Sequence, residues 1–88
     1  MEIEKKILVI DDVESNLLLV RTILEKSHPE YLILLAGSGI EDIEIAQKEM
    51  PDTILLDIYM PGMDGFETCK ILKSDERTSC IPVLNFFE

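Results

Sequence analysis

Four short apolar runs are spaced along the chain, separated by longer segments of mixed polarity. The runs cover residues 7–10, 31–36, 53–57 and 81–88, and they read ILVI, YLILLA, TILLD and IPVLNFFE. Continuous apolar runs of this length are typical of parallel strands buried on both faces, whereas half-buried strands alternate apolar and polar residues. Pro82 lies near the start of the last run, where a strand tolerates proline. The pattern therefore predicts four buried strands.

The segment after the first run has the spacing of an amphipathic helix. We expect Ser15 to be its N-cap, since serine is a preferred capping residue. Pro29 disfavours helical backbone in the residue before it, so the helix is expected to end within SHPE. Six apolar residues would cover more than half of the helix surface: Leu17, Leu18, Leu19, Val20, Ile23 and Leu24.

A second helix is predicted between the second and third runs. Ser38 and Glu41 have the spacing of a capping box, and Met50-Pro51 would end the helix. One stripe at helical spacing is mostly apolar and contains Ile40, Ile43, Ala46, Gln47 and Met50.

A third helix is predicted after the loop MPGMDG, which proline and glycine mark as irregular. Asp64 and Glu67 could cap this helix, and Phe66, Cys69 and Leu72 would share its packed face. The full order is then β-α-β-α-β-α-β. Continuous apolar strands that alternate with helices predict an α/β fold, with a parallel sheet covered by helices on both faces. We expect one domain over residues 1–88, because no linker or internal repeat divides the chain.

The composition of the chain excludes several classes of function. The chain has 88 residues and a net charge of −10, from 18 acidic and 8 basic residues, so we expect no direct contact with nucleic acid. No signal peptide and no membrane-length apolar stretch is visible, which predicts a cytoplasmic protein without a membrane partner. Cys69 and Cys80 form no CxxC pair, and we expect both to be free thiols that serve packing.

Three acidic residues follow two of the predicted strands. Asp11 and Asp12 come directly after the first strand, and Asp57 ends the third. Taken singly, an aspartate at a strand end is more often a helix cap or a turn residue. If the two strands are neighbours, however, the three carboxylates meet at one sheet edge and repel each other. A hard cation such as Mg²⁺ would relieve the repulsion, and it would let a carboxylate attack an incoming phosphoryl group.

Three blocks of the sequence, ILVIDD, ILLDIYMPGMDGFE and IPVL, together resemble the receiver domain of two-component response regulators. The resemblance implies a flavodoxin-like, doubly wound parallel sheet with strand order 2-1-3-4-5. It implies that Asp57 accepts a phosphoryl group from a histidine kinase or a phosphotransfer protein, so that the domain is a phosphoacceptor and not an enzyme. It also implies that Asp12, Asp57 and the backbone carbonyl of Tyr59 bind Mg²⁺, with Asp11 contributing through water. Pro61 and Gly65 match the family's loop over the site.

The chain departs from the family at its C-terminal end. Phe87 takes the position of a serine or threonine that contacts the phosphoryl group in the family. The family's lysine, and the helix-strand-helix that carries it, have no counterpart, so we expect a C-terminally truncated receiver with an incomplete sheet. The fourth strand would then leave an open edge, which predicts a homodimer or higher oligomer through that edge or through the first helix.

Two alternatives remain open. A degenerate receiver could dimerise or dock a kinase without accepting phosphate, which Phe87 favours and the retained Asp11, Asp12 and Asp57 disfavour. A haloacid-dehalogenase-like phosphatase also uses an aspartate after a strand, but it needs a second aspartate where this chain has Tyr59.

Overall fold

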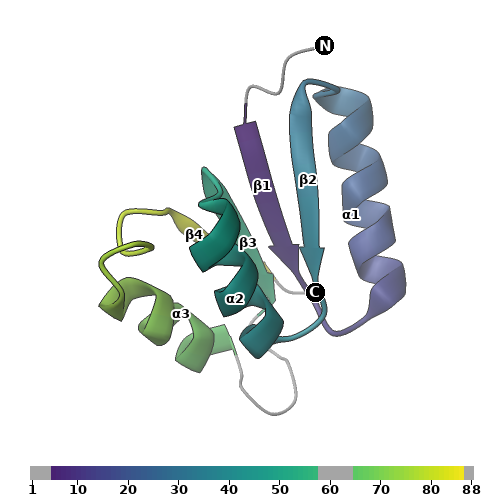
Figure 1. Ribbon diagram of the computed structural model, residues 1–88. Coiled ribbons are helices and arrows are strands. Elements are labelled where there is room, and N and C mark those ends of the chain that lie inside the picture. Colours follow the sequence, from purple (N-terminus) through teal and green to yellow (C-terminus); the bar gives the residue numbers. More distant parts are fainter. Residues whose placement is uncertain (1–4, 58–64, 87–88) are drawn as a thin grey trace.

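The computed structural model describes residues 5–57 and 65–86, which form one four-stranded sheet and three helices (Figure 1). This element order is the predicted one. In chain order the elements are β1 (Lys5–Ile10), α1 (Glu14–Ser27), β2 (Tyr31–Ala36), α2 (Gly39–Glu49), β3 (Thr53–Asp57), α3 (Gly65–Ser74) and β4 (Val83–Phe86).

The strands are all parallel and lie in the order β2-β1-β3-β4. This is the flavodoxin-like order as far as the fourth strand, so the predicted fold class is confirmed. Helix α1 covers one face of the sheet, and α2 and α3 lie side by side over the other (Figure 1). Both faces of β1 and β3 are therefore packed or partly packed, which explains why their sequences are apolar without alternation.

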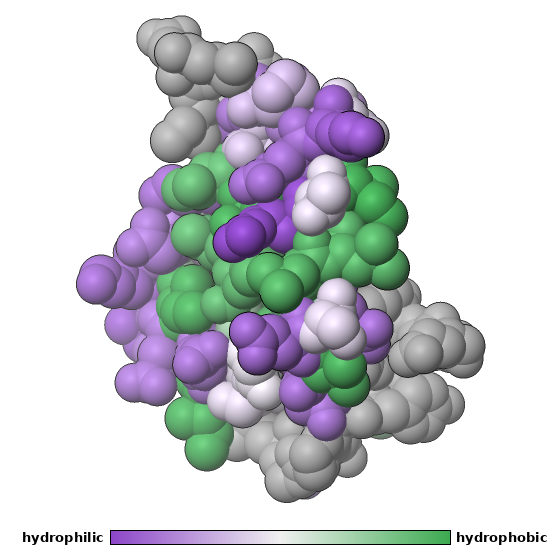
Figure 2. Space-filling view, turned by 90° about the vertical axis from the view of Figure 1, so that its right-hand side faces the viewer, coloured by the Kyte–Doolittle hydropathy of each residue, from purple (hydrophilic) through white to green (hydrophobic). Residues whose placement is uncertain are grey.

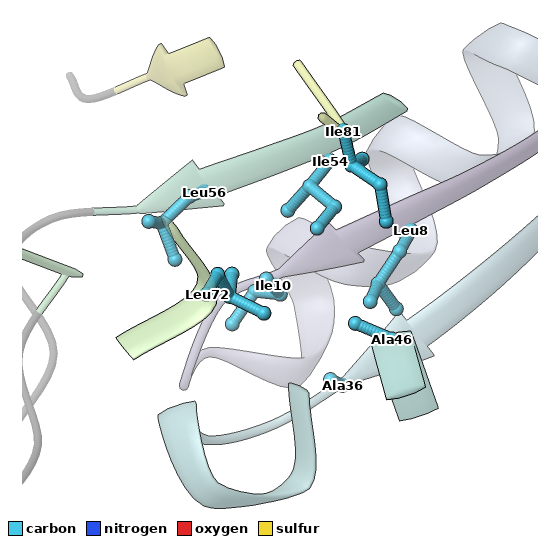
Figure 3. Close-up of a cluster of buried hydrophobic side chains, with 8 residues drawn as sticks. All are labelled: Leu8, Ile10, Ala36, Ala46, Ile54, Leu56, Leu72 and Ile81. Carbon is cyan, nitrogen blue, oxygen red and sulfur yellow. The ribbon is translucent and has the colours of Figure 1, made fainter. Parts of the chain in front are cut away.

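The larger of two core clusters lies between the sheet and the pair α2 and α3. Its side chains come from the strands β1, β2 and β3, from the two helices and from Ile81 just before β4, and they meet over the middle of the sheet (Figure 3). The smaller cluster lies under α1 and is built on Ile7, Val9, Leu17 and Ile33. The eight buried members of the larger cluster are Leu8, Ile10, Ala36, Ala46, Ile54, Leu56, Leu72 and Ile81.

Helix α1 begins one residue before the predicted cap. Its N-cap is Val13, which makes no side-chain capping bond, so the prediction for Ser15 is wrong. The reason is that the Asp11 carboxylate already accepts a hydrogen bond from the Val13 backbone N–H and turns the chain into the helix. The predicted stop is confirmed, because the helix ends at Ser27, two residues before Pro29.

Helix α2 has the predicted cap. The Ser38 hydroxyl accepts a hydrogen bond from the Glu41 backbone N–H at 3.2 Å, while the Glu41 carboxylate accepts one from the Gly37 N–H at 2.7 Å. Met50 ends the helix in a left-handed conformation, with φ of 49°, immediately before Pro51. Local sequence therefore determines both ends of this helix.

The buried faces of α2 and α3 differ from the predicted stripes. Ile40 is 62% exposed and Phe66 is 66% exposed, so both assignments to a packed face were wrong. Small or polar residues are buried instead, since they allow the two helices and the sheet to approach closely. These are Gly39, Asp42 and Ala46 on α2, and Gly65 and Thr68, with Leu72, on α3.

The two cysteines are free thiols, as predicted, but only one of them packs. Cys69 is half-buried against the larger core cluster, whereas Cys80 is exposed in the connection between α3 and β4. A packing role for Cys80 was therefore a wrong prediction. Asp64, Pro61 and Phe87 lie outside the described residues. None of the helices in the described ranges is long and apolar enough to cross a membrane.

Candidate functional site

The carboxyl edge of the sheet brings two of the predicted site residues to the same level. Strands β1 and β3 are neighbours, and Ile10 is the register partner of Leu56. The next residue on each strand is an aspartate, Asp11 after β1 and Asp57 at the end of β3. The predicted juxtaposition of these two strand ends is therefore present in the backbone. On its other side, Asp57 is paired with Phe86 of β4.

Asp11 is almost fully buried, with 1% of its surface exposed. One carboxylate oxygen accepts a hydrogen bond from the Val13 N–H at 2.9 Å, and the other accepts one from the Asn16 side-chain amide at 3.1 Å. Each oxygen keeps a further lone pair, because a carboxylate oxygen can accept more than one bond. Asp11 thus holds the turn into α1 and still offers oxygen ligands at the edge.

Asn16 is a member of this site that sequence reasoning missed. It lies in the first turns of α1 and is half-buried, and its amide donates to the Asp11 carboxylate. The signal available in the sequence was its position one helical turn after Asp12, which places a donor close to the acidic pair. Asn16 fixes the direction in which the Asp11 oxygens point.

Asp12 is the exposed member of the acidic pair. It follows Asp11 directly, and its carboxylate is open to solvent at the same edge of the sheet. A buried carboxylate on Asp11 next to an exposed carboxylate on Asp12 is suited to a cation that keeps part of its water shell.

The predicted metal ligands are only partly described. The backbone of Asp57 is placed, but its side chain and all of Tyr59 lie outside the described residues, as does the loop up to Asp64. Among the side chains that the structure does describe, no group of three acidic, histidine or cysteine residues is gathered as a metal site. The donors that are placed, Asp11 and Asp12, are carboxylate oxygens, which are the ligands that Mg²⁺ prefers. This part of the set fits the cation.

The fold, the strand order and the aspartates at the carboxyl edge of the sheet, Asp11, Asp12 and Asp57, define a class of protein. The chain belongs to the response regulator receiver domain family, whose model matches residues 7–86.

Individual relatives agree with this assignment. The chain is 43% identical over 79 residues to the response regulator PleD of Caulobacter vibrioides. The matched residues make up 90% of this chain and 17% of PleD. It superimposes with a TM-score of 0.88 on the N-terminal domain of a response regulator receiver protein from Methanoculleus marisnigri JR1, at 40% identity over 93% of this chain and 65% of that one. The receiver domain of sensor histidine kinase PA1611 from Pseudomonas aeruginosa PAO1 has the same fold, with a TM-score of 0.84 at 23% identity. The match covers 92% of this chain and 65% of the PA1611 receiver, which is described with a magnesium ion coordinated in its active-site cleft. The chain thus spans less than two thirds of each of these proteins.

Proposed function

We propose that this chain is a phosphoacceptor domain that takes a phosphoryl group onto Asp57 in the presence of Mg²⁺. The observation that carries the proposal is the register between β1 and β3, which sets the backbone of Asp57 level with Asp11 at the carboxyl edge. Ligands of open parallel sheets bind at this edge. Membership of the receiver family supports the same role for the aspartate that ends the third strand.

The reaction requires a nucleophile and a way to reduce charge repulsion. An Asp57 carboxylate oxygen would attack the phosphorus of a phosphohistidine, forming an O–P bond as the P–N bond breaks, and the imidazole would keep the bonding electron pair. Asp11, Asp12, Asp57 and the Tyr59 carbonyl would hold the cation. When bound, Mg²⁺ supplies neutralisation of the negative charge on the phosphoryl oxygens. The burial of Asp11 and its bond to Asn16 keep its ligand oxygens in one orientation.

The partner that fits this chemistry is a histidine kinase or a phosphotransfer protein, since either can present a phosphohistidine. The chain itself would be modified and would not turn over a separate substrate. An acidic chain whose two cysteines form no disulfide suits a cytoplasmic setting. The PA1611 receiver, whose active-site cleft coordinates magnesium, supports the choice of cation.

Replacing Asp12 with Asn should weaken Mg²⁺ binding about tenfold or more while changing stability little, because Asp12 is an exposed oxygen ligand. Asp11→Ala should weaken binding as well and also lower the free energy of unfolding by about 1–3 kcal/mol, since the N–H of Val13 loses its acceptor. Calorimetric Mg²⁺ titration and urea unfolding measure the two effects. Glu25→Gln, which removes an exposed acid near the other end of α1, is the matched control and should keep wild-type affinity. Equal Mg²⁺ affinity of Asp12→Asn and the wild type would contradict the ligand assignment.

A second role, self-association, is favoured by exposed apolar side chains. Figure 2 shows a band of hydrophobic residues across the side of the molecule that carries α1. On α1, Leu19 is 59% exposed and Ile23 is 54% exposed. On β4, Leu84 is 56% exposed, and it lies beside Leu55 of β3. We propose that a second copy of the chain covers this surface.

Sedimentation velocity at micromolar concentration tests the second copy. The wild type should sediment as a dimer or higher oligomer, and Leu84→Glu should raise the dissociation constant at least about tenfold, because a charge would replace an apolar contact at the interface. Ile40→Glu is the matched control, since Ile40 is also exposed but lies on α2, over the other face of the sheet. A folded wild-type monomer across the whole concentration range would refute this role and leave phosphoacceptance untouched.

A further inference from the structure

Asp42 is a fully buried acid that the proposed phosphoacceptor chemistry does not use. It lies in the first turn of α2, and its exposed surface is 0%. Neither of its carboxylate oxygens accepts a hydrogen bond. It shares the buried face of α2 with Gly39 and Ala46, and Ala46 belongs to the larger core cluster. An acid in such a position is an exception, because buried polar groups in proteins are nearly always paired.

The elements packed against α2 offer this carboxylate no counter-ion among the described residues. Helix α2 contacts α3, β2 and β1, and its Gln47 amide also donates a hydrogen bond to Asp75 in the connection after α3, where Asp75 pairs with Arg77. On α3 the Lys73 ammonium is bound to the backbone carbonyls of Ser79 and Ile81, and on β1 the Lys6 ammonium pairs with Glu49. The titratable side chains on these elements and on α2 itself are Glu67, Cys69, Lys70, Lys73, Tyr31, Lys5, Lys6, Glu41, Glu44, Lys48 and Glu49.

Burial therefore decides the protonation state. Removing an ionised carboxylate from water without a partner is far more costly than burying the neutral acid. Burial raises the pKa of the Asp42 carboxyl from its ordinary value of 3.8 to about 7, and no charged group opposes or adds to this effect within the described part of the chain.

We propose that Asp42 is a proton-binding site between α2 and the core. Its carboxyl is protonated when α2 packs tightly against α3 and the sheet, and its ionisation loosens the packing of α2. The buried cluster next to Asp42 extends to β3, the strand that ends in Asp57. Leu56, the residue before Asp57, lies in the same core cluster as Ala46, the neighbour of Asp42 one turn along α2. The packing face of α2 and the end of β3 therefore share one buried cluster.

The direction of the pH effect follows from the raised pKa. Between the unfolded value near 3.8 and the folded value of about 7, the native state binds more protons than the unfolded state. Stability must then fall as the pH rises through this window, and the full penalty is present above about pH 7. A shift of about three pKa units corresponds to at most about a thousandfold change in the folding equilibrium.

Urea unfolding of the full chain at about pH 5 and about pH 8 tests the proposal. For the wild type we expect the folding equilibrium constant to fall about a hundredfold between these values. Asp42→Asn and Asp42→Ala should remove most of this pH dependence of stability. At the higher pH, Asp42→Ala should be more stable than the wild type. Glu44→Gln is the matched control: it removes one exposed acid from the same helix and should keep the wild-type dependence.

Carboxyl carbon NMR of the wild-type chain measures the site directly, whether or not the variants fold. A titration midpoint for Asp42 near pH 7 supports the proposal. A midpoint near pH 4, or an Asp42→Ala chain with the wild-type pH dependence of stability, overturns it. Neither result depends on whether Asp57 accepts phosphate, so this proposal and the proposed function can fail separately.

Discussion

Asp57→Asn is expected to abolish phosphorylation of the chain by a small phosphoryl donor such as acetyl phosphate in the presence of Mg²⁺. The amide of asparagine has no anionic oxygen with which to attack phosphorus, so the covalent step has no nucleophile. The fold should survive, because Asp57 is the last residue of β3 and its backbone pairing with Phe86 does not depend on the side chain.

Intact-mass spectrometry measures this result. The wild type should gain the mass of one phosphoryl group, and the gain should disappear when Mg²⁺ is chelated. Glu76→Gln serves as the control, since it removes one exposed acid from the connection between α3 and β4, at the opposite end of the sheet. If Asp57→Asn still gains the phosphoryl group, the acceptor lies elsewhere. If the wild type gains none, the degenerate-receiver alternative replaces the phosphoacceptor.

Leu8→Ala should produce the largest loss of stability, about 2–5 kcal/mol in the free energy of unfolding. Leu8 is 0% exposed in the central strand β1, and its side chain belongs to the larger core cluster between the sheet and helices α2 and α3. Truncation removes its transfer free energy and leaves a cavity that a well-packed interior closes only partly. Such a loss is a large part of the total stability of a small domain.

Urea denaturation followed by circular dichroism tests this expectation. Ile40→Ala is the matched control, because it also truncates a large aliphatic side chain, but on α2, where Ile40 is 62% exposed and lies outside the proposed dimer surface. It should change the free energy of unfolding by less than about 1 kcal/mol. Similar losses for Leu8→Ala and Ile40→Ala would show that the cluster around β1 is not the main source of stability.

Much of the architecture could be predicted because its signals are local or depend on simple periodicity. The apolar runs identified all four strands, and two of them, Tyr31–Ala36 and Thr53–Asp57, have the predicted bounds. Proline and the Ser38–Glu41 pair located helix ends, since these residues act on backbone only a few positions away. The meeting of Asp11 with the end of β3 followed from topology, as the carboxyl ends of parallel strands share an edge.

The failures share a different physical origin, which is packing between elements. A search for large apolar residues selected Ile40 and Phe66, yet both lie on exposed surfaces. Close approach of α2 to the sheet selects small residues such as Ala46, and it buries Asp42 at a cost that no sequence pattern reports. Asp11 shows the same limit from another side. It was predicted as a cation ligand, and the structure adds that the same carboxylate also holds the start of α1.

The central place of β1 in the sheet has a consequence for the order of folding. The N-terminal strand pairs with β2 on one side and with β3 on the other, and β3 follows only after two helices. The unit of β1, α1 and β2 can close over a short loop, whereas the pairing of β1 with β3 must close a longer one and lose more chain entropy. We infer that this second pairing is the slower event. It is also the event that brings the backbone of Asp57 level with Asp11, so the carboxyl edge that carries the proposed site is assembled late on the folding pathway.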